Sequence, residues 1–214
     1  MHADPLQVLI ATPIYDSKLD YRFTESLLRT YSLGKLLHPD DRLQACFLPG
    51  EANLSNARNA LVAYALREDA DVLFWIDADT YWKPEDFWKL VYSPYDYITG
   101  LCPQKTAERA ACIRPLPNEK PPVEGILEIE GCGCGFLKLS RACFEKLYIE
   151  SPAYIYGTDE RHMLYQEGIK PDGFYISEDL NVCRKWRSLG GHIYADVLIG
   201  TGHVGTGIPF EFLK

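Results

Sequence analysis

The chain has 214 residues, of which 47% are hydrophobic and 24% charged, a composition ordinary for one globular domain with its own core. Its 22 basic and 30 acidic residues give a formal net charge of −8, so we expect no nucleic-acid partner. No apolar run approaches the roughly 20 residues that a transmembrane helix needs.

In the first half of the chain, short apolar runs alternate with segments of helical periodicity. The apolar runs predict strands at residues 7–11, 42–48, 72–76 and 96–100. Apolar residues spaced near the helical period predict helices at residues 21–37, 53–68 and 84–91. We expect the second helix to be capped by Asn53 or Ser55 and the third to begin at Pro84.

The second half is less regular. Residues 103–125 contain five prolines and no clean period, which predicts a loop. Residues 126–131 and 136–140 alternate between apolar and polar, which predicts two half-exposed strands. The remaining expected elements are helix 140–147, an irregular tyrosine-rich span 148–175, helix 177–191, strand 192–199 and a glycine-rich loop 200–207. The alternation of strands and helices predicts an α/β sheet with helices on both faces, and ligands of such sheets bind beyond the carboxyl ends of the strands.

Two carboxylates, Asp77 and Asp79, follow directly on the apolar run 72–76. In extended backbone, residues two apart project to the same side, so both carboxylates can face one point. Paired carboxylates are typical ligands of Mg²⁺ or Mn²⁺. A turn at the end of a strand, where Asp and Thr are common, is the alternative interpretation of the same residues.

Four stretches, in their order along the chain, resemble the nucleotide-sugar glycosyltransferases of the GT-A fold: VLFWIDADTYWKP, GCGCGFLKLSR, SEDLNVCRKWRSLGGHIYADV and GHVG. The resemblance extends from Val8 to Gly205. It implies one domain over 1–214 with a mixed, mostly parallel sheet, a nucleotide-binding half over about 1–105 and an acceptor and catalytic half over about 106–214. The two cysteines in GCGCG depart from the pattern, in which one or none is expected.

The resemblance implies roles for residues that bind metal and donor. Asp79 would bind Mn²⁺ or Mg²⁺ directly, Asp77 would bind the metal or the donor's ribose, and His203 would be the third metal ligand. The residues expected to contact the donor are Thr12, Pro13, Tyr15, Arg58, Asp77, Lys105 and Gly133. The alternatives are a hydrogen-bonded loop histidine, a surface-packed Tyr15 and a solvent-facing Arg58.

Glu178 and Asp179 open the last predicted helix, where the helix dipole favours acids whatever their role. Neighbours on a helix point about 100° apart, so only one of them can face an acceptor. The resemblance favours Asp179 as base or acceptor anchor, with Glu178 second, and leaves inverting and retaining chemistry open. It also implies acceptor contacts from the span 148–175, with Tyr154 and Tyr156 as candidates; packing of a long loop is the alternative.

We therefore expect a metal-dependent glycosyltransferase that uses a UDP-sugar and a hydroxyl of a glycan or glycoprotein. IDADT also fits the signature of haloacid-dehalogenase-type phosphatases, but that motif usually lies on the first strand and needs a later acidic cluster. A non-catalytic sugar-nucleotide-binding module is the third possibility. Cys132 and Cys134 do not predict a zinc site, because a structural zinc needs four ligands and no second pair follows.

The cysteines and the first residues bear on the compartment. Seven cysteines are an odd number without paired spacing, which indicates reduced thiols. The opening MHADPLQVLIATP lacks the basic stretch of a signal peptide. We expect a cytoplasmic protein, in the host cytoplasm if the gene is viral.

Overall fold

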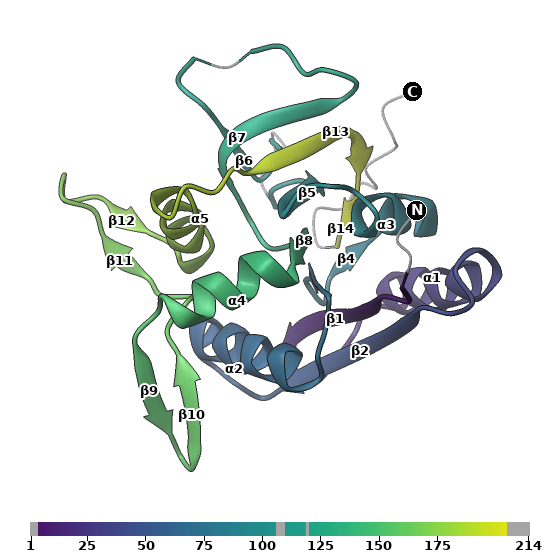
Figure 1. The fold of residues 1–214 in the computed structure, drawn as a ribbon, viewed down its shortest axis with the longest axis horizontal. Helices are drawn as coiled ribbons and strands as arrows, with labels where there is room; N and C mark the ends of the chain where they lie inside the picture. The colour runs from purple at the N-terminus through teal and green to yellow at the C-terminus, as the bar shows by residue number, and fades with distance from the viewer. Residues whose placement is uncertain (1–3, 106–109, 119, 205–214) are drawn as a thin grey trace.

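The computed structural model of the chain describes residues 4–105, 110–118 and 120–204 (Figure 1). A sheet of eight strands forms its centre: β1 (Gln7–Ile14), β2 (Arg42–Pro49), β3 (Val72–Ile76), β5 (Tyr97–Leu101), β6 (Ile113–Pro115), β7 (Ile126–Cys132), β8 (Phe136–Ser140) and β13 (Tyr194–Gly200). Their order across the sheet is β2-β1-β3-β8-β5-β13-β7-β6.

The sheet is mixed. β1 is parallel to both β2 and β3, and β5 is parallel to β13. β8 is antiparallel to its neighbours β3 and β5, and β7 is antiparallel to β13 and β6. Of the eight strands, only β7 and β8 therefore run against the others, which confirms the predicted mixed, mostly parallel α/β sheet.

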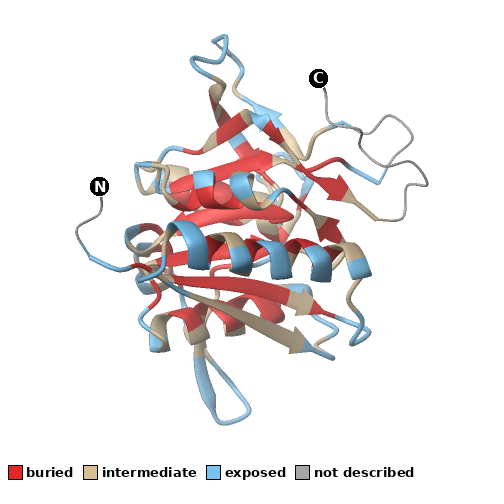
Figure 2. Ribbon diagram, turned by 90° about the vertical axis from the view of Figure 1, so that its right-hand side faces the viewer, coloured by how far each residue is buried: buried red, intermediate tan, exposed pale blue. Residues whose placement is uncertain are grey.

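Helices cover both faces of the sheet (Figures 1 and 2). The helices are α1 (Tyr21–Leu37), α2 (Leu54–Arg67), α3 (Pro84–Val91), α4 (Arg141–Ile149) and α5 (Glu178–Ser188). α1 and α3 pack on one face with Val8 and Ile10 of β1, whereas α2, α4 and α5 pack on the other with Leu9 and Ala11. Because successive strand residues point to opposite faces, the continuous apolar run of β1 serves both cores.

The start of α2 is set by its cap. The side chain of Asn53 accepts a hydrogen bond from the backbone N–H of Asn56 at 2.9 Å, so Asn53 rather than Ser55 is the cap. Arg58 follows one turn later, with its side chain turned into the protein. α3 begins at Pro84, as predicted.

The prediction of half-exposed strands is wrong for β8. Its first four residues are buried, including Lys138. The Lys138 ammonium donates to the carbonyl of Tyr95 at 2.6 Å and that of Ser93 at 3.3 Å. Burial lowers the pKa of Lys138 to about 8, although the charge of Asp96 opposes the shift.

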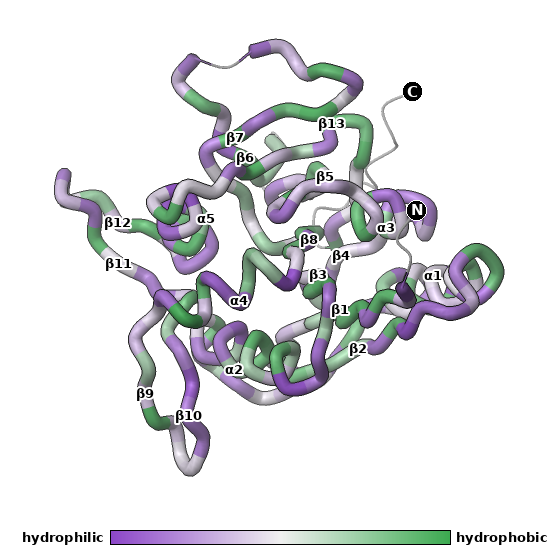
Figure 3. Tube along the Cα trace, viewed as in Figure 1, coloured by the Kyte–Doolittle hydropathy of each residue, from purple (hydrophilic) through white to green (hydrophobic). Residues whose placement is uncertain are grey.

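The irregular regions contain more pairing than the sequence predicted. The span 148–175 includes the hairpin of β9 (Ala153–Tyr156) and β10 (Asp159–His162), and β11 (Gly168–Ile169), which pairs with β12 (Tyr175–Ile176). The expected loop 103–125 contains β6, and β4 (Thr80–Tyr81) pairs with β14 (Gly202–His203). Residues 205–207 of the predicted glycine-rich loop lie outside the described part. None of the helices in the described residues has the length and hydropathy of a membrane span. Figure 3 shows that both hairpins mix hydrophilic and hydrophobic residues.

Candidate active site

A cleft of about 710 Å³ opens where β1 and β3 end. It brings together residues that are far apart in the sequence, and the predicted site residues that line it are Pro13, Tyr15, Arg58, Asp77, Asp79, Lys105 and His203. The polar loop after β1 also contributes Asp16, Lys18 and Asp20, which no sequence motif indicated. Their position after the carboxyl end of a strand was the signal that could have identified them.

Both carboxylate oxygens of Asp79 have side-chain partners. The Nε2 atom of His203 lies 3.1 Å from Asp79 Oδ1, and the Lys105 ammonium forms an ion pair with Oδ2. Burial raises the pKa of the Asp79 carboxyl, but the hydrogen bonds and charges of His203 and Lys105 outweigh it, and the pKa falls to about 2. The structure thus places a localised negative charge at Asp79.

His203 is positioned by the short ladder between β4 and β14. His203 pairs with Thr80, and the N–H of Val204 donates to the carbonyl of Asp79 at 2.8 Å. The Nδ1 atom of His203 lies 2.8 Å from the carbonyl oxygen of Pro103. Burial lowers the pKa of His203, but the contacts with Asp79 and Pro103 dominate and raise it.

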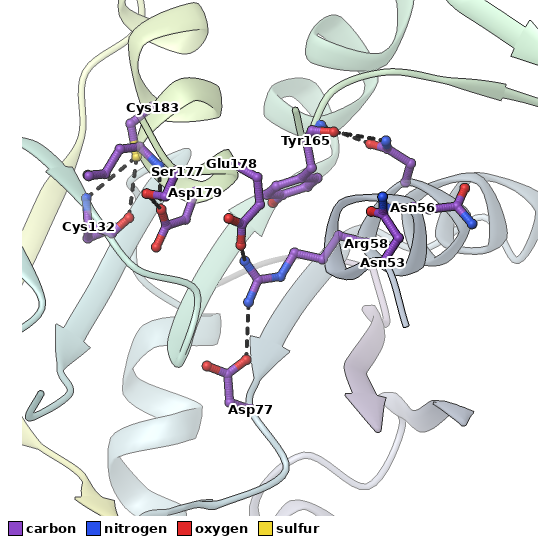
Figure 4. Close-up of polar contacts among 12 residues, drawn as sticks. Asn53, Asn56, Arg58, Asp77, Cys132, Tyr165, Ser177, Glu178, Asp179 and Cys183 are labelled. Atoms are coloured by element: carbon purple, nitrogen blue, oxygen red, sulfur yellow. Dashed lines mark hydrogen bonds and ion pairs between the residues drawn. The ribbon is translucent and has the colours of Figure 1, made fainter. Parts of the chain in front are cut away.

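Arg58 joins two carboxylates from opposite halves of the chain (Figure 4). Its Nη1 atom donates to Glu178 Oε1 at 2.6 Å and its Nη2 atom to Asp77 Oδ1 at 3.2 Å. The Arg58 side chain is 4% exposed and lies near the rings of Trp75 and Tyr165. Burial opposes its charge, but nearby acidic groups, Asp77 and Glu178 among them, outweigh burial and raise its pKa. The alternative of a solvent-facing arginine is wrong.

The two acids at the start of α5 have different surroundings. The Glu178 side chain is buried against Arg58, and burial raises the pKa of Glu178 although the Arg58 charge opposes the shift. Asp179 Oδ1 accepts from the N–H of Leu180 at 2.7 Å and from the Ser177 hydroxyl. A Cβ atom on Gly133 would lie 3.4 Å from Asp179 Oδ2, so Gly133 neighbours this acid.

Two predicted donor residues do not line the cleft. Gly133 lies beside Asp179, and Thr12 is fully buried at the end of β1, where its hydroxyl has no hydrogen-bond partner among the described residues. Tyr15, by contrast, lines the cleft and is 74% exposed, so a ligand in the cleft can contact its ring.

Within the described residues, no group of three His, Cys, Asp or Glu side chains is arranged to hold a metal ion. Asp77 faces Arg58, whereas Asp79 faces His203 and Lys105. Two carboxylates and an imidazole nevertheless share one cleft, and this donor set suits Mn²⁺ or Mg²⁺. The side chain of Lys105 is 51% exposed, so it can leave Asp79 without disturbing the core.

The tyrosines of the span 148–175 fall into two groups. Tyr154 and Tyr156 line a pocket of about 390 Å³ on the side of α2 that faces the β9–β10 hairpin, and their hydroxyls donate to Asn56 at 2.9 Å and Glu51 at 3.2 Å. Tyr165 is fully buried and its ring packs edge-on against Trp75. The first turn of α2 separates this pocket from the cleft, because Leu54 and Arg58 line the cleft while Asn53, Asn56 and Asn59 line the pocket.

No family model and no curated protein matches the sequence. Among solved structures, A197 from STIV is similar, with a TM-score of 0.62 and 17% identity over 94% of this chain and 86% of that chain. The structure of GalNAc-T7 with UDP, GalNAc and Mn²⁺ has a TM-score of 0.53 and 12% identity over 94% of this chain and 44% of that chain. This chain thus matches less than half of GalNAc-T7, and identities this low show the fold alone. The protein has the α/β fold of GT-A-type glycosyltransferases.

Proposed function

We propose that the protein is a metal-dependent glycosyltransferase that moves a sugar from a UDP-sugar to a hydroxyl of a glycan. The observation that carries the proposal is the gathering of Asp77, Asp79, His203 and Arg58 in one cleft. The cleft lies at the sheet edge where α/β proteins bind ligands. The shared fold with GalNAc-T7, whose structure contains UDP, GalNAc and Mn²⁺, supports it.

The charges of the cleft explain why a metal ion is part of the proposal. Asp16, Asp20, Asp77 and Asp79 line it together with the cations Lys18, Arg58 and Lys105. Arg58 is already paired with two carboxylates, and Lys18 and Lys105 with one each, so the cleft has little positive charge left for a diphosphate. A divalent cation held by Asp79 and His203 would supply that charge and stabilise the leaving diphosphate.

The other cleft residues have roles that follow from their positions. Tyr15, exposed at the cleft, would stack on the base. Lys105, released from Asp79, would reach the diphosphate as a point charge. Arg58 would keep Asp77 oriented. That contact also argues against the phosphatase alternative, in which Asp77 would have to be the nucleophile.

Asp179 is the proposed base or acceptor anchor, and Glu178 has a different role. Glu178 is bound to the buried Arg58 at 2.6 Å, whereas within the described residues the side-chain hydrogen bonds of Asp179 are all on Oδ1, and its Oδ2 atom lies near the small Gly133. A carboxylate that deprotonates an acceptor hydroxyl must be free to approach it. Asp179 meets this requirement better than Glu178.

The acceptor would bind in the pocket lined by Tyr154 and Tyr156, next to the first turn of α2. Asn53, Ser55 and Gln166 line the same pocket and present uncharged donors and acceptors. Aromatic faces pack against the C–H faces of sugar rings, and amides and hydroxyls bind ring hydroxyls. These groups suit a glycan.

A thermal-shift screen tests the donor and the metal together. UDP, GDP, CMP and dTDP are each added with Mn²⁺ and with EDTA. We expect UDP with Mn²⁺ to stabilise the fold most, by about 2.7 kcal/mol at roughly 100 times its Kd. Equal stabilisation in EDTA would contradict the metal bridge. Asp79→Asn should remove the metal-dependent part, and an unchanged response of this variant would remove Asp79 from the site.

A further inference from the structure

A separate pocket, of about 260 Å³, is lined by residues of α5, β6, β7, β12 and the turn that joins β11 to β12. Three basic residues line it: Arg114 of β6, Lys170 after β11 and Arg184 of α5. Leu180 and the buried Ile176 contribute apolar surface beneath them. The pocket shares no lining residue with the cleft or with the pocket of Tyr154 and Tyr156.

The positive charge of this pocket is not balanced within it. Lys170 forms an ion pair with Asp172 at 3.4 Å. The side chains of Arg114 and Arg184 form no ion pair or hydrogen bond with any residue that the structure describes. Glu130 is the remaining charged residue of the lining, and it too has no ion-pair partner within the described chain. Two arginines against one carboxylate leave a net positive site in a protein of net charge −8.

The pocket adjoins the proposed base. Leu180 and Arg184 are one turn apart on α5, so they face the same side, and Asp179 immediately precedes Leu180. On the facing strand β7, Gly131 lines the pocket, and just past the end of that strand a Cβ atom at Gly133 would lie 3.4 Å from Asp179 Oδ2. A Cβ atom at Gly131 would lie 3.2 Å from both Leu180 and Cys183, so the missing side chain lets α5 approach β7 closely.

We propose that this pocket binds an oxyanion group, a phosphate, sulfate or carboxylate, carried by the acceptor. Arginine presents paired N–H donors that match such groups, and Arg114 of β6 and Arg184 of α5 line the same pocket. The small volume suits one anionic group with part of a sugar ring. That the anion belongs to the acceptor rests on the proposed function; anion binding itself does not.

The test is a titration of the protein with inorganic phosphate at constant ionic strength, in EDTA and without nucleotide. Binding is monitored by NMR through the chemical shifts of the backbone amides. Wild-type protein should show saturable shifts at residues around Leu180. Arg114→Gln with Arg184→Gln should weaken the apparent Kd by about tenfold or more, since both charge-assisted contacts are lost. Arg42→Gln, which removes an exposed arginine of β2, should bind like wild type.

The proposal is overturned if phosphate causes no saturable shifts, or if the double variant and Arg42→Gln bind equally well. Titrations with glucose 1-phosphate, glucuronate and glucose then show which anionic group the pocket prefers. The sugars that carry a phosphate or a carboxylate should bind, and uncharged glucose should not. Binding of glucose as tight as that of both acidic sugars also overturns it. The UDP and Mn²⁺ response of the double variant should stay intact. If neither the wild type nor any variant binds UDP, the proposed function is contradicted, whereas the proposed anion site is unaffected.

Discussion

The guanidinium of Arg58 lies 2.6 Å from the carboxylate of Glu178, a residue 120 positions further along the chain. Both side chains are buried, with 4% and 10% exposed, so the ion pair that joins the start of α5 to α2 is shielded from solvent. The second nitrogen of the same guanidinium reaches Asp77 in the cleft. One buried cation therefore connects the candidate metal ligands to the helix that carries the proposed base.

Replacing Arg58 should destabilise the protein strongly. Arg58→Met leaves Glu178 buried without its cation, which typically costs about 3–5 kcal/mol of unfolding free energy. Urea denaturation measures it, with Arg42→Met at an exposed position as the control. A loss under about 1 kcal/mol would show that the pair adds little. The double variant Arg58→Met, Glu178→Leu should recover part of the loss, because the buried carboxylate is then gone and the remaining partner, Asp77, has a side chain that is 37% exposed to solvent.

The two acids of α5 should separate in a transfer assay. Asp179→Asn should lower transfer about 100-fold or more while UDP binding and melting temperature stay near wild type. Glu178→Gln should instead lower the melting temperature, since its partner Arg58 is buried. The assignment fails if Asp179→Asn transfers at the wild-type rate, or if Glu178→Gln loses transfer without losing stability.

His203 can be tested by mutation with His192 as the control. His203→Ala should weaken metal-dependent UDP binding by about tenfold or more, because it removes a proposed metal ligand. His192 is 62% exposed and contacts Glu128 far from the cleft, so His192→Ala should bind UDP and Mn²⁺ normally. Calorimetric titration compares them. Identical affinities in both variants would return His203 to the role of a hydrogen-bonded loop residue.

The pKa shifts at Asp79 and His203 predict a pH dependence in EDTA. The lowered pKa of Asp79 stabilises the fold above its ordinary value of 3.8, and this contribution is lost as the pH falls toward about 2. The raised pKa of His203 stabilises the fold fully below its ordinary value of 6.5, and this contribution is lost as the pH rises through the raised value.

Urea denaturation should therefore show the unfolding free energy of the wild type falling as the pH rises above about 6.5, relative to His203→Gln. With Mn²⁺ the trend should reverse, because the metal binds the unprotonated imidazole and so binds more tightly at higher pH. A pH profile of the wild type that is parallel to that of His203→Gln in EDTA would contradict the expected ion pair with Asp79.

Tyr156 and Tyr165 test the acceptor pocket against packing. Tyr156 is 48% exposed at that pocket, so Tyr156→Ala should lower transfer while UDP binding and melting temperature change little. Tyr165 is fully buried, so Tyr165→Ala should cost about 3–5 kcal/mol of unfolding free energy. If Tyr156→Ala also unfolds early and never affects transfer selectively, the acceptor binds elsewhere.

The sequence by itself determined the elements whose signals are local. The apolar run of β1 and the cap and periodicity of α2 depend on neighbours within a few residues, so they could be predicted. The half-exposed interpretation of β8 failed because the pattern counts a lysine as exposed, whereas Lys138 is long enough to reach the carbonyls of Ser93 and Tyr95. The ladder of β4 and β14 has partners more than 100 positions apart, which no local pattern contains.

The same division holds at the site. Sequence motifs and their resemblance to GT-A glycosyltransferases indicated Asp77, Asp79, Arg58 and His203. The two aspartates and His203 follow predicted strands, which placed them at the edge where such sheets bind ligands. Only the tertiary structure decided which acid of α5 meets Arg58. Two adjacent acids on a helix are equivalent in the sequence, and the rotation of α5, set by the packing of Val182 and Trp186 into the core, turns Glu178 inward.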